Sequence, residues 1–157
     1  ILRAGFITAQ MLSEVIGEVI YDPAVLAQSP DENLKPKAPG MKYRHYAPKG
    51  ELIIYEGTVD KVAEKINELA QKSCMEGKKV GILATEETCH LYQNGVVKTI
   101  GRREEEASIA RGLYDVLRSF DEENVEVIFG ESFSEGELGQ AIMNRLLKAA
   151  GYHIEKV

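Results

Sequence analysis

Several absences narrow the range of functions open to this 157-residue sequence. No apolar run approaches the roughly 18 residues that a membrane-spanning helix needs. Basic residues are not in excess, because 19 Lys and Arg stand against 25 Asp and Glu and give a net charge of −6. That balance gives no sign of a nucleic-acid or membrane surface. The two cysteines, Cys74 and Cys89, lack metal-binding spacing, and neither begins a C-x5-R phosphate loop. We expect reduced thiols that are buried or half-buried.

The first residues predict a small apolar unit. The chain begins without methionine and on the run ILRAGFI, so we expect it to be part of a longer polypeptide. ILRAGF is typical of a strand end, Thr8 is a suitable N-cap for a short helix, and Gly17 would end that helix. Residues 18–22, EVIYD, predict a further strand. The helix would bury Met11, Leu12, Val15 and Ile16. These would pack either on the rest of the chain or on a partner outside it.

From Asp22 to Gly50 the periodic pattern disappears. Every proline of the sequence falls in this segment, and proline removes a backbone donor and disfavours helix just before it. A connection of nearly thirty residues without regular structure is typical of a linker, a lid or a binding segment. No acidic residue lies between Glu32 and Glu51, whereas Lys35, Lys37, Lys42, Arg44 and Lys49 lie there. Residues 33–50 therefore carry +5 and the rest of the chain −11.

After Gly50 strands alternate with helices, which predicts an α/β fold with a mainly parallel sheet covered by helices on both faces. The predicted strands are residues 51–56, 78–85, 96–101, 125–130 and 152–157. One helix follows the cap Thr58, and others span residues 104–119 and 138–150. The inward faces are expected to carry Val59, Val62, Ala63, Ile66, Leu69 and Ala70 in the first, and Ala107, Ala110, Leu113, Leu117 and Phe120 in the second. The strand order cannot be read from the sequence.

The stretch PGMKYRHYAP, residues 39–48, combines the chemistry of an anion-binding loop. Arg44 can bind phosphate or carboxylate oxygens in a bidentate manner, and Lys42 adds a point charge. His45 titrates near neutrality and can donate a hydrogen bond, while the two tyrosines offer flat faces for a base or an apolar wall. The alternative is a solvated linker whose aromatic residues attach it to a domain surface.

A resemblance to a known family favours the first interpretation. KPKAPGMKYRHYAPKGEL closely resembles the interdomain linker of two-domain threonylcarbamoyl-AMP synthases, whose hallmark is K-x-R-H-Y-x-P. The flanks agree: ILRAGFITAQMLSEVIGEV is similar to the last strand and helix of the YrdC-like catalytic domain. EASIARGLYDVLRSFDE and GELGQAIMNRLLKAAG resemble the family's Rossmann-like C-terminal domain. The resemblance divides the chain into 1–21, the tail of a catalytic domain; 22–50, an interdomain linker or lid; and 51–157, a three-layer Rossmann-like domain.

The resemblance also implies a reaction. The full enzyme is a nucleotidyltransferase that condenses L-threonine, bicarbonate and Mg-ATP to threonylcarbamoyl-AMP and pyrophosphate, for threonylcarbamoyladenosine formation in tRNA. It would be cytoplasmic, and its substrate pockets lie in the YrdC-like domain, over which the linker closes. This chain would then hold no catalytic residue, metal or cofactor and be inactive alone. Its lid residues would be Lys42, Tyr43, Arg44, His45, Tyr46 and Pro48.

Two other roles stay open for residues 51–157. The domain could be a regulatory module that binds a nucleotide in its own sheet crevice, or a docking domain for the tRNA threonylcarbamoyl transferase proteins. Direct tRNA binding is not expected, because the chain outside residues 33–50 carries −11. Arg145 and Lys148 form either a patch that docks the catalytic domain or a solvated helix face.

The remaining polar features favour structural roles. The glycine-rich turn at residues 130–141 resembles an anion site, but Glu131, Glu135 and Glu137 would repel a phosphate, so we expect a loop and helix cap. Residues 103–106 are interpreted as a solvated helix start. His90 and His153 have no partners at metal-ligand spacing.

Overall fold

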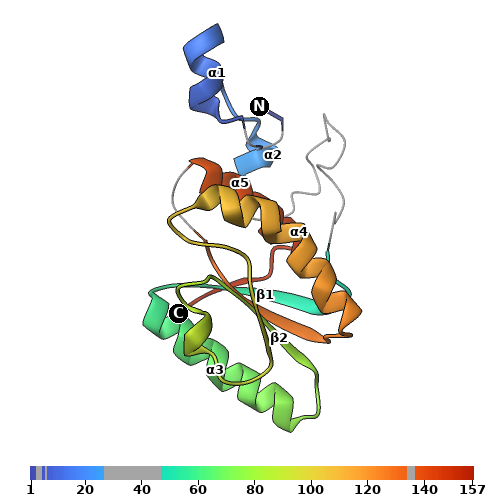
Figure 1. The fold of residues 1–157 in the computed structure, drawn as a ribbon. Coiled ribbons are helices and arrows are strands. Elements are labelled where there is room, and N and C mark those ends of the chain that lie inside the picture. The colour runs from blue at the N-terminus through green and yellow to red at the C-terminus, as the bar shows by residue number, and fades with distance from the viewer. Residues whose placement is uncertain (3–4, 6, 27–46, 134–136) are drawn as a thin grey trace.

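The structure is a three-layer α/β domain with a small amino-terminal extension (Figure 1). It is a computed structural model that describes residues 1–157 apart from 3–4, 6, 27–46 and 134–136. Its sheet has five strands in the order β3-β2-β4-β1-β5, and the strand pairings of the described residues are all parallel. The strands are β1 (Glu51–Glu56), β2 (Val80–Ala84), β3 (Val96–Thr99), β4 (Val127–Glu131) and β5 (Ile154–Lys156). The α/β prediction is confirmed.

Helices cover both faces of the sheet, as the alternating pattern predicted. The helices are α3 (Val59–Met75), α4 (Glu106–Glu122) and α5 (Glu137–Ala149), with a short 3-10 turn, η1 (Cys89–Leu91), between β2 and β3. One core lies between the sheet and α3, and the other between the sheet and the pair α4 and α5 (Figure 1). Strands β2 and β4 are buried along their whole length, which explains their near-continuous apolar sequences.

The predicted inward faces of α3 and α4 are largely correct. Val62, Ala63, Ile66 and Ala70 of α3 are buried, as are Leu113, Leu117 and Phe120 of α4. Two details differ. Val59 is 43% exposed because it begins the helix at the margin of the sheet, and the buried Ile109 takes the central position expected for the half-buried Ala107 and Ala110.

The amino-terminal helix forms as predicted, but its apolar face is not buried. In α1 (Ala9–Ile16) the Thr8 hydroxyl accepts a hydrogen bond from the Met11 N–H, and Gly17 ends the helix at φ 85°. Met11, Val15 and Ile16 are 47%, 83% and 69% exposed and Leu12 is half-buried, so the first of the two alternatives, that this face packs on the rest of the chain, is wrong. No residue of α1 is buried. The second alternative, that this face packs on a partner outside the chain, stays open.

The segment that follows α1 also differs from prediction. Residues 18–22 do not form a strand of the sheet; instead the Asp22 N–H donates to the Ile1 carbonyl at 2.8 Å. The strand end expected at residues 1–6 falls partly on residues that are not described. The predicted irregular segment 22–50 begins with a helical turn, α2 (Pro23–Leu26), because proline is favoured at the first position of a helix. Residues 47–50, at its other end, are irregular as expected.

No helix in the described part of the chain is both long and apolar enough to cross a membrane.

Gly81, in the centre of β2, provides a test of how tightly the α4 side of the core is packed. A Cβ at this position would lie 2.7 Å from the Phe120 ring and 3.0 Å from the Val125 side chain. Gly81→Ala should therefore lower the free energy of unfolding by about 1–3 kcal/mol, measured by urea denaturation. Gly5→Ala, where a Cβ meets nothing within 4 Å, is the matched control. Equal stability of the two variants would show that the Phe120 ring moves aside freely.

Candidate functional site

The topology marks one end of the sheet as the place for a site. In open α/β sheets ligands bind beyond the carboxyl ends of neighbouring strands whose connections leave to opposite faces. Strand β1 continues into α3 on one face, while its neighbour β4 continues into α5 on the other. Tyr55 and Glu131 are register partners near the carboxyl ends of these strands. The chemistry at this crevice therefore depends on the groups around Glu131.

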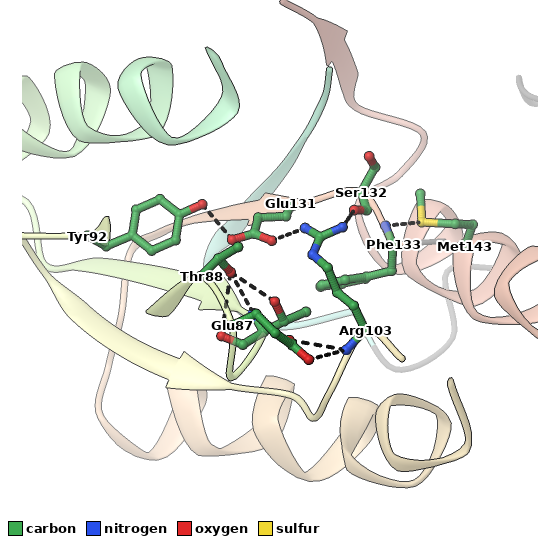
Figure 2. Close-up of polar contacts among 9 residues, drawn as sticks. Glu87, Thr88, Tyr92, Arg103, Glu131, Ser132, Phe133 and Met143 are labelled. Carbon is green, nitrogen blue, oxygen red and sulfur yellow. Dashed lines mark hydrogen bonds and ion pairs between the residues drawn. The ribbon is translucent and has the colours of Figure 1, made fainter. Parts of the chain in front are cut away.

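Glu131 is a buried carboxylate with two partners. Its side chain forms an ion pair with Arg103 and accepts a 2.6 Å hydrogen bond from the Tyr92 hydroxyl (Figure 2). The residue is 1% exposed. Burial, and next the negative charge of Glu131, raise the pKa of Tyr92 above its ordinary value, so this hydroxyl stays a donor. A buried carboxylate is tolerated only with such partners.

Arg103 comes from the loop after β3 and joins three segments. Its guanidinium donates to Glu131 and to the Ser132 carbonyl, at 3.4 Å for the latter, and lies 5.9 Å from the centre of the Phe133 ring (Figure 2). Its backbone N–H donates to both carboxylate oxygens of Glu87, at 3.0 and 3.1 Å. The loops after β2 and β3 are thereby fastened to the end of β4.

The loop after β2 is held from within as well. The Thr85 N–H donates to the Thr88 hydroxyl at 3.2 Å, and the two threonine hydroxyls lie 2.9 Å apart. Both threonines are buried. Desolvation favours the neutral acid at Glu87, but hydrogen bonds from backbone N–H groups outweigh it and hold the pKa of Glu87 below its ordinary value. The loop therefore presents an ionised carboxylate to the Arg103 N–H.

Among the described residues at this edge, the two groups suited to attract an anion already have carboxylate partners from the protein. Arg103 is paired with Glu131, and the Gly139 N–H in the first turn of α5 donates to Glu106 Oε2 at 2.9 Å. A phosphate would have to displace both carboxylates. The prediction of a loop and cap at residues 130–141 agrees with this arrangement. Glu131, however, is a buried strand residue and not part of an exposed turn, while Glu135 lies outside the described residues.

The residues predicted as a lid do not belong to this cluster. Residues 42–46 lie outside the described part of the chain, so Lys42, Tyr43, Arg44, His45 and Tyr46 stay predictions. Pro48 is half-buried at the end of the same segment. The two predicted docking residues, Arg145 and Lys148, are half-buried on α5, and the Arg145 guanidinium lies 5.9 Å from the centre of the Tyr114 ring of α4.

The cysteines and histidines suggest no metal site. Within the described ranges, no group of three His, Cys, Asp or Glu side chains is arranged to hold a metal ion. Cys89 is half-buried as predicted, but Cys74 is exposed, because the buried face of α3 ends at Ala70. His153 lies 3.6 Å from a Glu51 carboxylate oxygen and 3.5 Å from one of Glu155.

Sequence reasoning missed the cluster of Tyr92, Arg103 and Glu131. Residues 103–106 were expected to be solvated, yet the Arg103 side chain is only 31% exposed. One signal was available: Glu131 directly follows VEVIFG, an almost uninterrupted apolar strand. A charge at the end of such a strand needs a partner, but the sequence does not say which basic residue supplies it.

Comparison with known proteins places the chain in a family. Residues 7–151 match the family described as threonylcarbamoyl-AMP synthase, C-terminal domain. The chain is 46% identical over 151 residues to the threonylcarbamoyl-AMP synthase of Bacillus subtilis, covering 96% of this chain and 41% of that protein. It is also 46% identical to the Pyrococcus abyssi protein of that name, covering 100% of this chain and 44% of the relative. The chain thus spans less than half the length of these curated relatives.

Comparison with solved structures leads to the same family. The Pyrococcus abyssi Sua5 protein in complex with L-threonine matches with a TM-score of 0.82 and 45% identity, over 99% of this chain and 43% of that one. A variant of the same protein with a consecutive histidine and tyrosine both replaced by alanine also has a TM-score of 0.82, at 44% identity over 99% of this chain and 42% of that one. The C-terminal Sua5 domain of a Pyrococcus horikoshii protein matches over 71% of this chain and 100% of that one, with 36% identity and a TM-score of 0.57.

The ion pair between Arg103 and Glu131 leads to a prediction about the stability of the fold. Arg103→Met should lower the free energy of unfolding by about 3 kcal/mol, because it leaves the Glu131 carboxylate buried without its charged partner. Glu131→Gln keeps an acceptor for the Tyr92 hydroxyl and should lower the free energy of unfolding by less than Arg103→Met does. The double variant should be more stable than Arg103→Met alone, as urea denaturation at pH 7 can measure. Additive losses would show that the two side chains act independently.

The buried tyrosines Tyr55 and Tyr92 lead to a prediction about how stability changes at alkaline pH. Burial, followed by the nearby Glu155 and Glu51, raises the pKa of Tyr55 to about 12, and the pKa of Tyr92 is raised as well. Unfolding releases these side chains to their ordinary pKa of 10.0. Above pH 10 the unfolded chain then binds fewer protons than the folded one, so stability falls as pH rises, by about 1.4 kcal/mol per pH unit for each tyrosine.

Tyr92→Phe removes one of these groups and should reduce the alkaline slope of the unfolding free energy by about 1.4 kcal/mol per pH unit. The measurement is urea denaturation at several pH values between 9 and 11.5. Tyr55→Phe should act in the same direction through its own hydroxyl. A slope that stays the same in both variants would mean that neither tyrosine is protected from ionisation by the fold.

Proposed function

The chain belongs to the family of threonylcarbamoyl-AMP synthase C-terminal domains, and we propose that it is the accessory domain and connecting segment of an L-threonylcarbamoyladenylate synthase. The whole protein would convert threonine, bicarbonate and Mg-ATP to threonylcarbamoyl-AMP and pyrophosphate, for threonylcarbamoyladenosine formation in tRNA. Catalysis would belong to an amino-terminal YrdC-like domain. Within this chain, residues 1–21 would be the tail of that domain, 22–50 the connection and 51–157 the accessory domain.

The exposed apolar face of α1 supports this division. Val15 and Ile16 of α1 are 83% and 69% exposed, and Ile20, which follows the helix, is 73% exposed, although such side chains normally pack against a neighbour. The matched relatives are more than twice as long as the region they share with this chain. We propose that the amino-terminal domain covers this face. The structure of the Pyrococcus horikoshii C-terminal domain, which matches 71% of this chain, supports an accessory domain that folds separately.

We propose that the connecting segment acts as a lid over the pocket of the amino-terminal domain. The support is the motif K-x-R-H-Y-x-P, which is complete in this sequence as Lys42, Arg44, His45, Tyr46 and Pro48. Arg44 would hold phosphate oxygens, while closure would exclude water from hydrolysable intermediates. The alanine variant of the Pyrococcus abyssi protein replaces a consecutive histidine and tyrosine, and His45–Tyr46 is the only such pair in this sequence.

The alternative of a nucleotide-binding regulatory module fits the geometry less well. Its nucleotide would bind at the carboxyl ends of β1 and β4. There Arg103 is paired with Glu131 and the first turn of α5 with Glu106, so both positions that favour a phosphate are occupied by the protein's own carboxylates. This observation favours an accessory role without a nucleotide of its own.

The lid proposal is tested in the full-length protein by ATP- and threonine-dependent pyrophosphate release. Arg44→Ala, His45→Ala and Tyr46→Ala should each lower turnover by about 10- to 100-fold, because each removes a group that positions or encloses the substrate. Lys35→Ala removes a positive charge from the same segment but outside the motif, and should behave like the wild type. Unchanged turnover and substrate affinity in all three motif variants would refute the lid.

A further inference from the structure

The α5 helix carries a stripe that faces the amino-terminal extension and not the sheet. Ala141, Asn144 and Lys148 are spaced three and four residues apart, so they lie on one side of the helix. Ala141 packs with Val25 of α2 and with Tyr21 in a small cluster separate from the two main cores. Figure 1 shows α2 directly beside α5. We call Ala141, Asn144 and Lys148 the α5 stripe; Ala141 and Asn144 contact the extension, and the spacing places Lys148 on the same side of the helix.

Asn144 supplies the polar contact of this docking. Its side-chain amide donates to the Val25 carbonyl at 2.9 Å, across 119 positions of the sequence. A helix of four residues satisfies none of its last carbonyl groups internally, so an acceptor at its end needs an outside donor when it is covered. Val25 is 6% exposed and Asp22, just before α2, is 8% exposed. The Val25 side chain is therefore buried against Ala141, and its carbonyl oxygen accepts a hydrogen bond from Asn144.

The other end of the connecting segment is held on the same domain. The Lys49 N–H donates to Asp121 Oδ1, near the end of α4, at 2.7 Å. The next residue, Gly50, lies so close to the backbone that an added Cβ would stand 2.5 Å from the Val125 carbonyl oxygen. The Glu51 N–H then donates to the Glu126 carbonyl as β1 begins. Residues 49–51 are consequently attached to the domain by hydrogen bonds from two backbone N–H groups and by one close backbone approach.

We propose that the α5 stripe is a docking surface for residues 20–26 and that Asn144 is its anchoring residue. The α/β domain would then hold both ends of the connecting segment, one at Asn144 and one at Asp121. Residues 20–22 also bond to the first residue of the chain, since the Asp22 N–H donates to the Ile1 carbonyl. The docking therefore positions the α1 region relative to the α/β domain. The functional part of this inference rests on the function proposed above.

The test compares Asn144→Asp with Gln140→Glu. Asn144→Asp keeps the size of the side chain but replaces the N–H donor with a negative acceptor facing the Val25 carbonyl. Gln140→Glu makes the same chemical change at an exposed position of the same helix. Hydrogen exchange of the amides of residues 20–26 should become about tenfold faster in Asn144→Asp and stay unchanged in Gln140→Glu. Protection of the strand amides should not change in either variant, which shows that the domain remains folded.

The second readout is pyrophosphate release by the full-length protein. Asn144→Asp should lower turnover, and adding Arg44→Ala should lower it by less than the product of the two single effects, because both act through the connecting segment. Unchanged exchange at residues 20–26 in Asn144→Asp would overturn the anchor. Faster exchange with wild-type turnover would overturn its positioning role. If Asn144→Asp lowers turnover while Arg44→Ala does not, the anchor stands and the lid fails.

Discussion

The arrangement of the carboxyl edge of the sheet depends on one buried charge, the carboxylate of Glu131. It ends the apolar strand β4 and is 1% exposed, so it must be compensated. Arg103 and Tyr92 provide the compensation from two other loops. The backbone N–H of Arg103 also donates to the Glu87 carboxylate. Arg103 therefore joins the loops after β2 and β3 to Glu131 at the end of β4. A hydrophobic pair could fill the same space, but it would not specify which loop meets which strand.

This edge is where an α/β domain would ordinarily bind a ligand, and the composition of the edge supports the proposed division of roles within the chain. The groups suited to an anion, Arg103 and the first turn of α5, are bonded to Glu131 and Glu106. The connecting segment differs in composition, because five basic residues occur there without an acidic one between Glu32 and Glu51. In the function proposed above, ligand contacts therefore belong to this segment and not to the α/β domain that follows it.

The domain is suited to carry that segment because both attachment points lie on its helical layer. Asn144 on α5 bonds to Val25, and Asp121 on α4 bonds to Lys49. The two helices share one core with the sheet, in which Leu113, Leu117 and Leu146 are almost completely buried. A rigid layer keeps the two attachment points at a fixed separation, whatever the segment between them does. Holding a segment in place requires no site of the domain's own.

Features that depend on local pattern could be predicted from the amino-acid sequence. Apolar periodicity placed the strands and helices after Gly50, Thr8 and Gly17 marked the ends of α1, and the K-x-R-H-Y-x-P string pointed to the family. Tertiary structure decided what depends on contacts between distant residues: the strand order, the pairing of Arg103 with Glu131 across 28 positions, and the docking of Val25 on Asn144 across 119. It also left the apolar face of α1 exposed, and so chose between the two alternatives that the sequence had left open. Local propensity fixes backbone conformation residue by residue, whereas burial is set by which elements meet, and the spacing of apolar residues carries no information about that.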